Sequence, residues 1–179
     1  KHTTDWSEAV MNKSEYIALK ARIDYELQNL NLIEQVLTQE GLFPKVVSTN
    51  ISGLDISSDL ARRAIGSYLH DYYNAIEKIA THVCRATGEG MPEGDNWHYQ
   101  LIFNMSLELD GLRPRLYSEK TLKLLNELRG FRHVFRNVYG VNLDSNKEMA
   151  LLKKLSKISK MLRRDLASFL SIMDEAFLQ

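Results

Sequence analysis

The sequence predicts an all-α protein: an antiparallel four-helix bundle with an additional short helix. Apolar residues recur at three, four and seven residue steps along every long segment, which is the pattern of helices that bury one face. All three prolines lie between these segments, so strands have little support anywhere in the chain. Helices joined by short or moderate loops bury their apolar faces most simply by packing antiparallel.

The first two helices are expected over residues 14–39 and 60–83. The first carries its apolar residues on one face and stops at Gly41 and Pro44, because glycine and proline end helices. A linker rich in Ser, Gly and Asp, residues 47–57, leads to the second helix, which ends before two glycines.

A short third helix is expected over residues 97–107, with Asp95 or Asn96 as its cap. The loop 110–117 follows it and contains the helix-breaking Pro114. This loop separates the short helix from the two long helices of the C-terminal half.

The fourth helix is expected to begin at Ser118 and to end at Gly140, which can adopt the left-handed conformation. The fifth helix starts with a capping box, Ser145 and Glu148, and continues to about residue 177. At 1.5 Å per residue it is on the order of 50 Å long. The buried stripe of the fourth helix comprises Leu124, Leu128, Phe131, Phe135 and Val138.

The chain has 179 residues, of which 44% are hydrophobic, and this size fits one domain. We expect residues 14–179 to form a single helical domain and residues 1–13 to be an N-terminal extension or tag remnant. The one cysteine, Cys84, excludes an intramolecular disulfide, and the histidines are too scattered for a zinc site. We therefore expect no metal, no cofactor, no membrane span and a cytoplasmic location. The apolar faces of the first and last helices favour a homodimer.

The formal net charge is zero, but the charges are unevenly distributed along the chain. Residues 111–164 hold 14 Lys and Arg against 4 Asp and Glu, and the remainder holds 9 against 19. The asymmetry is either neutralised inside the fold or displayed as an anion-binding face. Neutralisation is the favoured interpretation, because long bundle helices often carry complementary charges.

One face of the fourth helix carries most of the side chains suited to chemistry. Successive helical residues turn by about 100°, which places five of them within an arc of about 140°. No acidic residue of this segment offsets their charge, so negative charge comes either from Asp71 and Glu77 on the second helix or from a bound phosphate. The five residues, here called the arginine face, are Arg129, Arg132, His133, Arg136 and Asn137.

The segment 132–139 resembles the signature of the HEPN superfamily, in its HepT-like ribonuclease toxin branch. That signature is Arg, a polar residue that is usually Asn, three variable residues, His, any residue and Tyr. The segments 69–74 and 97–98 also resemble those of a HepT-like subgroup. The helix order agrees, and the resemblance covers nearly the whole chain from about residue 11.

The resemblance implies a homodimer in which two arginine faces meet in a composite cleft that cleaves RNA without a metal. The ribose 2′-hydroxyl would attack the adjacent phosphate, a histidine would take its proton, and Arg132 would stabilise the phosphorane. Arg129 and Arg136 would bind the substrate, an RNA with tRNA as one candidate. The resemblance also implies a toxin-antitoxin partner, a minimal nucleotidyltransferase that attaches AMP to the motif tyrosine, Tyr139.

The chain departs from the signature, because Asn137 occupies the histidine position and His133 the position usually held by Asn. The imidazole therefore moves by about 6 Å along the helix axis, and catalytic geometry tolerates much less. Either His133 serves as the base in a differently arranged cleft, or cleavage is lost and the fold acts as an interaction protein or adaptor. An amide cannot take a proton near neutrality, so Asn137 would only orient substrate.

Structural roles are expected for the other histidines and for the tyrosines of the second helix. His70 and the adjacent Asp71 point about 100° apart and rarely act on one atom. His98 is expected at a satisfied, partly buried position, and His82 beside core positions of the second helix. The tyrosines expected on the apolar side of the second helix are Tyr68, Tyr72 and Tyr73.

A basic run on the last helix is either an RNA-facing patch or a solvated face. It lacks interleaved aromatic residues and therefore lacks a platform on which bases could stack. The run comprises Lys153, Lys154, Lys157, Lys160, Arg163 and Arg164.

Overall fold

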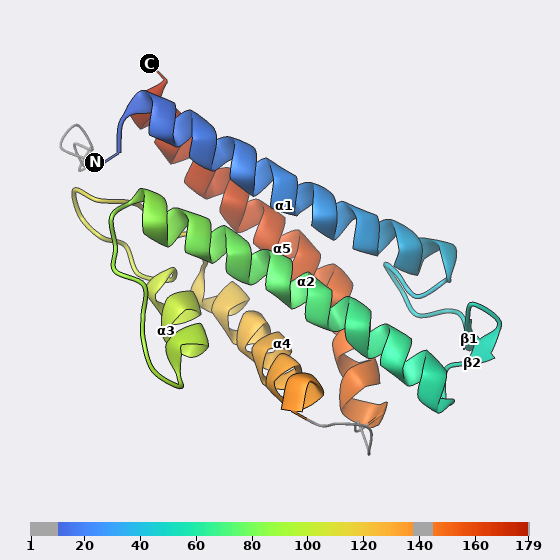
Figure 1. The fold of residues 1–179 in the computed structure, drawn as a ribbon. Helices are drawn as coiled ribbons and strands as arrows, with labels where there is room; N and C mark the ends of the chain where they lie inside the picture. The colour runs from blue at the N-terminus through green and yellow to red at the C-terminus, as the bar shows by residue number, and fades with distance from the viewer. Residues whose placement is uncertain (1–10, 138–144, 179) are drawn as a thin grey trace.

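Four long helices lie alongside one another, and each runs opposite to the long helix that precedes it in the chain (Figure 1). The computed structural model describes residues 11–137 and 145–178. In these residues the long helices are α1 (Lys13–Gln39), α2 (Asp59–Ala86), α4 (Glu119–Asn137) and α5 (Ser145–Phe177), and the short helix is α3 (Trp97–Asn104). The predicted all-α fold, a helical bundle with an additional short helix, is confirmed.

The start of α1 is fixed by local capping and by contacts with the end of α5. The Asn12 side chain accepts a hydrogen bond from the Glu15 N–H at 3.0 Å, and the Glu15 carboxylate accepts one from the Asn12 N–H at 2.8 Å. This capping box satisfies two N–H groups that the helix itself leaves unpaired. The Tyr16 hydroxyl donates to Asp174 at 2.6 Å, and the Tyr16 ring stacks on Phe177. These contacts join the first turn of α1 to the C-terminal end of α5.

The linker between α1 and α2 contains a small antiparallel hairpin, which the sequence interpretation missed. Strands β1 (Asn50–Ile51) and β2 (Leu54–Asp55) pair with each other. The turn between them consists of Ser52 and Gly53, whose φ angles are +49° and +79°. Two central residues with positive φ match the twist of flanking strands, so the turn promotes pairing. The expectation that strands have little support anywhere is therefore wrong for this segment.

Helix α3 is three residues shorter than the expected range 97–107, and its expected cap is not formed. Asn96 occupies the cap position, but its side chain makes no capping hydrogen bond. The helix ends early because the guanidinium of buried Arg113 donates to the carbonyls of Asn104, at 2.9 Å, and Leu107, at 2.8 Å. The same guanidinium pairs with Glu89, so its charge is compensated inside the fold.

Helix α2 is the central element, because it contacts α1, α3, α4 and α5. Its two apolar sides give it the largest share of the buried core, including Tyr72 and Tyr73. Gly66 on α2 lets two neighbouring helices approach closely, since an added Cβ would lie 2.6 Å from Phe135 of α4 and 3.0 Å from Glu148 of α5. This close approach brings the arginine-face helix against α2.

The described helices also carry apolar side chains on their outer surfaces. On α1 these are Ile17, Tyr25 and Leu32, each more than half exposed. The homodimer expected from the first and last helices stays a prediction. Over residues 11–137 and 145–178, every helix lacks the long apolar stretch that a membrane crossing requires.

Candidate functional site

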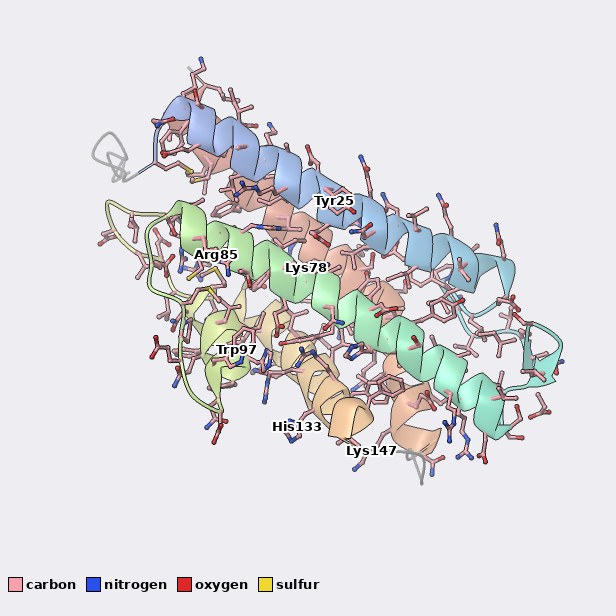
Figure 2. All side chains as sticks on the ribbon, in the orientation of Figure 1. Tyr25, Lys78, Arg85, Trp97, His133 and Lys147 are labelled. Carbon is pink, nitrogen blue, oxygen red and sulfur yellow. The ribbon has the colours of Figure 1, made fainter. Side chains whose placement is uncertain are left out.

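The arginine face of α4 is divided between an inward-pointing and an outward-pointing side chain. Arg132 points toward α2 and α3, and its side chain is only 13% exposed. His133, the next residue, is exposed at the end of α4 (Figure 2). Adjacent residues of a helix point about 100° apart, so the sequence order alone separates them. The side chains of Arg136 and Asn137, and the whole of Tyr139, lie outside the described residues.

Arg132 is held by groups from two other helices. Its Nε donates to Asn74 Oδ1 of α2 at 2.9 Å, and its Nη2 lies 3.6 Å from Glu77 Oε1 of the same helix. Its guanidinium also lies over the Tyr73 ring, 5.7 Å from the centroid, within the range of a cation–π interaction. Glu77 is therefore the acidic partner that the uncompensated charge of α4 required.

His98 of α3 completes this cluster and links Glu77 to Arg132. Its Nδ1 lies 2.6 Å from Glu77 Oε2, and its Nε2 lies 3.3 Å from Arg132 Nη1. An ionised carboxylate only accepts hydrogen bonds, so Nδ1 carries the proton and Nε2 presents its lone pair to Arg132. The Trp97 ring, 3.6 Å away between centroids, covers the imidazole. We call Asn74, Glu77, His98 and Arg132 the polar cluster.

The hydroxyl of Tyr73 lies beside the polar cluster and stays protonated. Burial is the main cause that raises the pKa of Tyr73, and the negative charge of Glu77 raises it further. The Tyr73 ring thus supplies a neutral, rigid wall under the guanidinium of Arg132.

Arg129 lies at the outer edge of the site. Its guanidinium stacks over the ring of Tyr99 from α3, 5.3 Å from the centroid, and its Nε donates to Asn126 at 3.2 Å. Within the described residues it has no carboxylate partner. The site therefore combines one neutralised arginine, Arg132, with one cation available to an anion.

Comparison with known families assigns this chain on the basis of its C-terminal two thirds. A family model described as HepT-like protein matches residues 64–173. The chain belongs to the HepT-like family. The match runs from α2 into α5 and contains the whole polar cluster, and it begins after α1, later than the sequence resemblance indicated. Comparisons with curated proteins and with solved structures gave no match.

The site of this HepT-like chain differs in part from its sequence interpretation. Of the two acidic residues proposed to face the arginines, Glu77 does so, while Asp71 is exposed and makes no ion pair among the described residues. Six residues along α2 amount to about 240° of rotation at 100° each, so the two carboxylates point to different sides of the helix. Reasoning from residues alone missed Asn74 and gave His98 only a structural role, although both lie in segments that resemble the HepT-like subgroup.

His70 and His82 of α2 are not members of the polar cluster. His70 packs against Phe135, with ring centroids 5.5 Å apart. His82 is half-buried, and burial together with Arg22 lowers its pKa. The structural roles expected for both histidines stay predictions. No group of three or more His, Cys, Asp or Glu in the described residues is arranged to hold a metal ion.

Two cations of the basic run of α5 pair with acidic side chains of neighbouring helices. Lys154 pairs with Glu127 of α4 at 2.5 Å, and Arg163 pairs with Glu34 of α1 at 3.0 Å. Glu34 also accepts a hydrogen bond from the buried Tyr72 hydroxyl at 2.6 Å, and burial raises the pKa of Tyr72. Internal neutralisation therefore accounts for part of the charge asymmetry.

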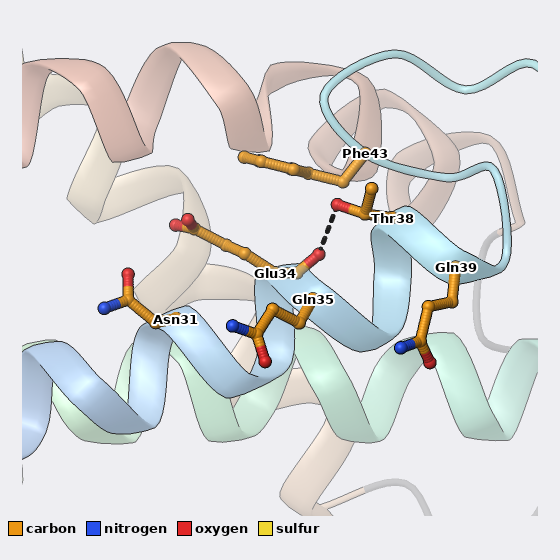
Figure 3. A pocket seen from close by; sticks show the side chains of 6 residues that line it. All are labelled: Asn31, Glu34, Gln35, Thr38, Gln39 and Phe43. Atoms are coloured by element: carbon orange, nitrogen blue, oxygen red, sulfur yellow. Dashed lines mark hydrogen bonds between the residues drawn. The ribbon is translucent and has the colours of Figure 1, made fainter.

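A shallow pocket of about 400 Å³ lies beside this basic run, at the C-terminal half of α1 (Figure 3). Phe43, from the loop after α1, lies over Glu34, and the Thr38 hydroxyl donates to the Glu34 carbonyl at 2.6 Å. The lining residues are Asn31, Glu34, Gln35, Thr38, Gln39 and Phe43, which lie outside the family match.

Proposed function

We infer that this HepT-like chain is the RNA-cleaving component of a toxin-antitoxin module, acting in the cytoplasm as a metal-independent endoribonuclease. The observation that carries the proposal is the position of Arg132. It occupies the motif arginine position, is oriented by Asn74 and Glu77, and lies near the second cation, Arg129. A fixed guanidinium next to a second cation suits a phosphodiester whose charge grows in the transition state.

The arginines have two different roles in this proposal. Arg132 stabilises charge on the phosphorane, while Arg129 and Arg136 bind neighbouring phosphates of the RNA. The base is a histidine, and two histidines lie near Arg132: His133 on the outer side of α4 and His98 in the polar cluster.

A homodimer is part of this proposal, with two α4 helices forming one composite cleft. Exposed apolar side chains next to the site support it, because an uncovered patch of this kind suits a protein contact. Val134 on α4 is 46% exposed, and Tyr99 and Phe103 on α3 are 41% and 40% exposed. Mass measured in solution at several protein concentrations tests the dimer, and a monomer at all of them contradicts it.

The cleavage test uses the purified chain and total tRNA in the presence of EDTA. Wild type is expected to produce discrete fragments, and Arg132→Ala is expected to reduce the rate by on the order of 10² to 10³, the effect of removing one transition-state donor. Arg115→Ala is the matched control, because Arg115 is exposed and pairs only with Glu108 in the described residues. Identical fragment patterns for wild type and Arg132→Ala contradict the enzyme proposal.

The adaptor is the second candidate function, and the burial of Arg132 favours it. An arginine that is 13% exposed and paired to Glu77 of the same chain is partly compensated before any ligand binds. In that case the chain binds a protein partner, the nucleotidyltransferase, without RNA chemistry. Intact RNA in every reaction, together with a stable complex between the two purified proteins, is the result that selects this candidate.

The proposed partner is a minimal nucleotidyltransferase that attaches AMP to Tyr139. Coexpression with the nucleotidyltransferase encoded beside this chain is expected to add AMP units to the intact mass. Tyr139→Phe is expected to lose the addition, and Tyr99→Phe, which changes an exposed tyrosine of α3, is expected to keep it. An unmodified mass under verified coexpression contradicts the AMP proposal.

A further inference from the structure

The polar cluster contains an acid–base pair that no motif position supplies. Glu77 of α2 and His98 of α3 are 21 residues apart in sequence, and their Oε2 and Nδ1 atoms lie 2.6 Å apart. On the other side of the ring, Nε2 lies 3.3 Å from Arg132 Nη1 of α4. Helices α2, α3 and α4 thus bring a carboxylate, an imidazole and a guanidinium into successive contact.

These hydrogen bonds determine which nitrogen of His98 carries the proton. The Glu77 carboxylate accepts a hydrogen bond from Nδ1, so the proton resides on that nitrogen. The lone pair of Nε2 then accepts from Arg132. A doubly protonated ring would place an N–H of His98 against an N–H of Arg132. The basic nitrogen Nε2 is therefore directed at the arginine that occupies the motif position.

The geometry points to His98 as the general base of RNA cleavage, with Glu77 as the positioning residue that orients it. This inference rests on the proposed ribonuclease function and names the histidine that performs the proton transfer. In the signature the base would be a histidine at the position that Asn137 occupies here. The inference gives this role to His98 of α3.

Contact distances favour His98 over His133 for this role. The Nε2 atom of His98 lies 3.3 Å from the Arg132 guanidinium, so a phosphate bound to that guanidinium lies within reach of it. His133 is exposed and directed about 100° away around the helix from Arg132 of the same chain. The side chain of His98 is 19% exposed, so it lies at the border between the bundle and solvent.

Substrate binding itself exposes the lone pair of His98. The 3.3 Å contact with Arg132 is long for a hydrogen bond that involves a charged donor. When a phosphate oxygen accepts from Nη1 instead, Nε2 no longer accepts from Arg132 and can accept from the neighbouring 2′-hydroxyl. The neighbouring ring of Trp97 keeps the imidazole in place during this exchange.

The proposed step balances without any further reactant. Nε2 takes the proton of the 2′-hydroxyl, and the 2′-oxygen forms a bond to phosphorus. The bond from phosphorus to the 5′-oxygen then breaks, the leaving oxygen takes a proton from solvent water, and the imidazolium gives its own proton back to the solvent. The products are a 2′,3′-cyclic phosphate and a 5′-hydroxyl, and Glu77 stabilises the imidazolium between the two proton transfers.

The test compares single-turnover cleavage of total tRNA, from pH 5 to pH 9, by wild type and three variants. His98→Gln is expected to lower the rate by on the order of 10² to 10⁴, the contribution of a general base, and to flatten the acid limb. Glu77→Gln is expected to move the acid limb to lower pH without weakening RNA binding, since the carboxylate that stabilises the imidazolium is gone. His82→Gln is the control, because His82 is half-buried on α2 away from the cluster.

Each outcome separates this inference from the function on which it rests. Wild-type cleavage with an unchanged rate and acid limb in His98→Gln overturns the assignment of the base and leaves the ribonuclease proposal standing. Absence of cleavage by wild type overturns both. Circular dichroism verifies that the variants fold, and if His98→Gln does not fold, an unmoved acid limb in Glu77→Gln overturns the inference.

Discussion

Replacing Gly66 with Ala tests how closely α2 approaches α4 and α5. The added Cβ would lie 2.6 Å from Phe135 Cε2 and 3.0 Å from Glu148 Oε1. Two opposing effects are expected. Alanine is favoured over glycine inside a helix by about 0.8 to 1.0 kcal/mol. Overpacking a well-filled interior costs about 1 to 3 kcal/mol, because neighbouring side chains must leave their preferred rotamers.

Gly130→Ala on α4 is the reference variant, because comparison with it separates the packing effect from the helix-propensity effect. Nothing lies within 4 Å of a Cβ added there, so this variant carries the helix-propensity gain alone. Since the propensity effect is the same in both variants, their unfolding free energies should differ by about 1 to 3 kcal/mol, with Gly66→Ala the less stable. That corresponds to a difference of about 2 to 12 °C in Tm for a domain of this size.

Urea unfolding followed by circular dichroism measures both variants at one fixed protein concentration. A fixed concentration matters because association of the folded chains would change the apparent stability. Equal stabilisation in Gly66→Ala and Gly130→Ala would refute the reasoning, since it would mean that Phe135 and Glu148 move away from the new methyl group at no cost.

Two buried ionisable side chains, Glu148 and Arg113, give further predictions. Burial against α2 raises the pKa of Glu148 to about 7, so its protonated form contributes stability that is complete below pH 4.5 and is lost as pH rises through about 7. Glu148→Gln should therefore raise the unfolding free energy at pH 8, by up to about 3 kcal/mol, and have little effect at pH 4.5; equal changes in Tm at both values contradict this. Arg113→Met should destabilise the fold by about 3 to 5 kcal/mol in urea unfolding, because it leaves Glu89 without its buried partner. Arg115→Met, the exposed control in the same loop, should change stability by less than about 0.5 kcal/mol, and equal losses in both arginine variants contradict the role of burial.

The bounds of α1 and α5 could be predicted because their signals are local, while the expected end of the fourth helix at Gly140 lies outside the described residues. Helix α1 begins within one residue of its expected start, and α5 runs over its expected range. Apolar spacing and the helix-ending Gly41 act over a few neighbouring residues, which a single sequence displays directly. The hairpin at 50–55 was missed because its two-residue strands are too short to show a period.

The candidate site could be predicted in its α4 part and in one residue of α2. Arg132 was identified from the arginine face, and Glu77 was one of two acidic residues expected to meet it. His98 was expected at a satisfied, partly buried position, and it occupies one, but its neighbours could not be predicted. It lies 34 residues from Arg132 in sequence, and only the packing of α3 against α2 and α4 brings them together.

The sequence alone specifies which segments of this chain are helical, which face of each is apolar, and that α4 carries more positive charge than it can offset. These properties depend on residues three or four positions apart. Packing specifies that Glu77, and not Asp71, meets Arg132, that His98 joins them, and that Gly66 lets the helices approach closely. Such pairings depend on the rotation and register of whole helices, which are determined when the bundle closes around its core and are not encoded in any one segment.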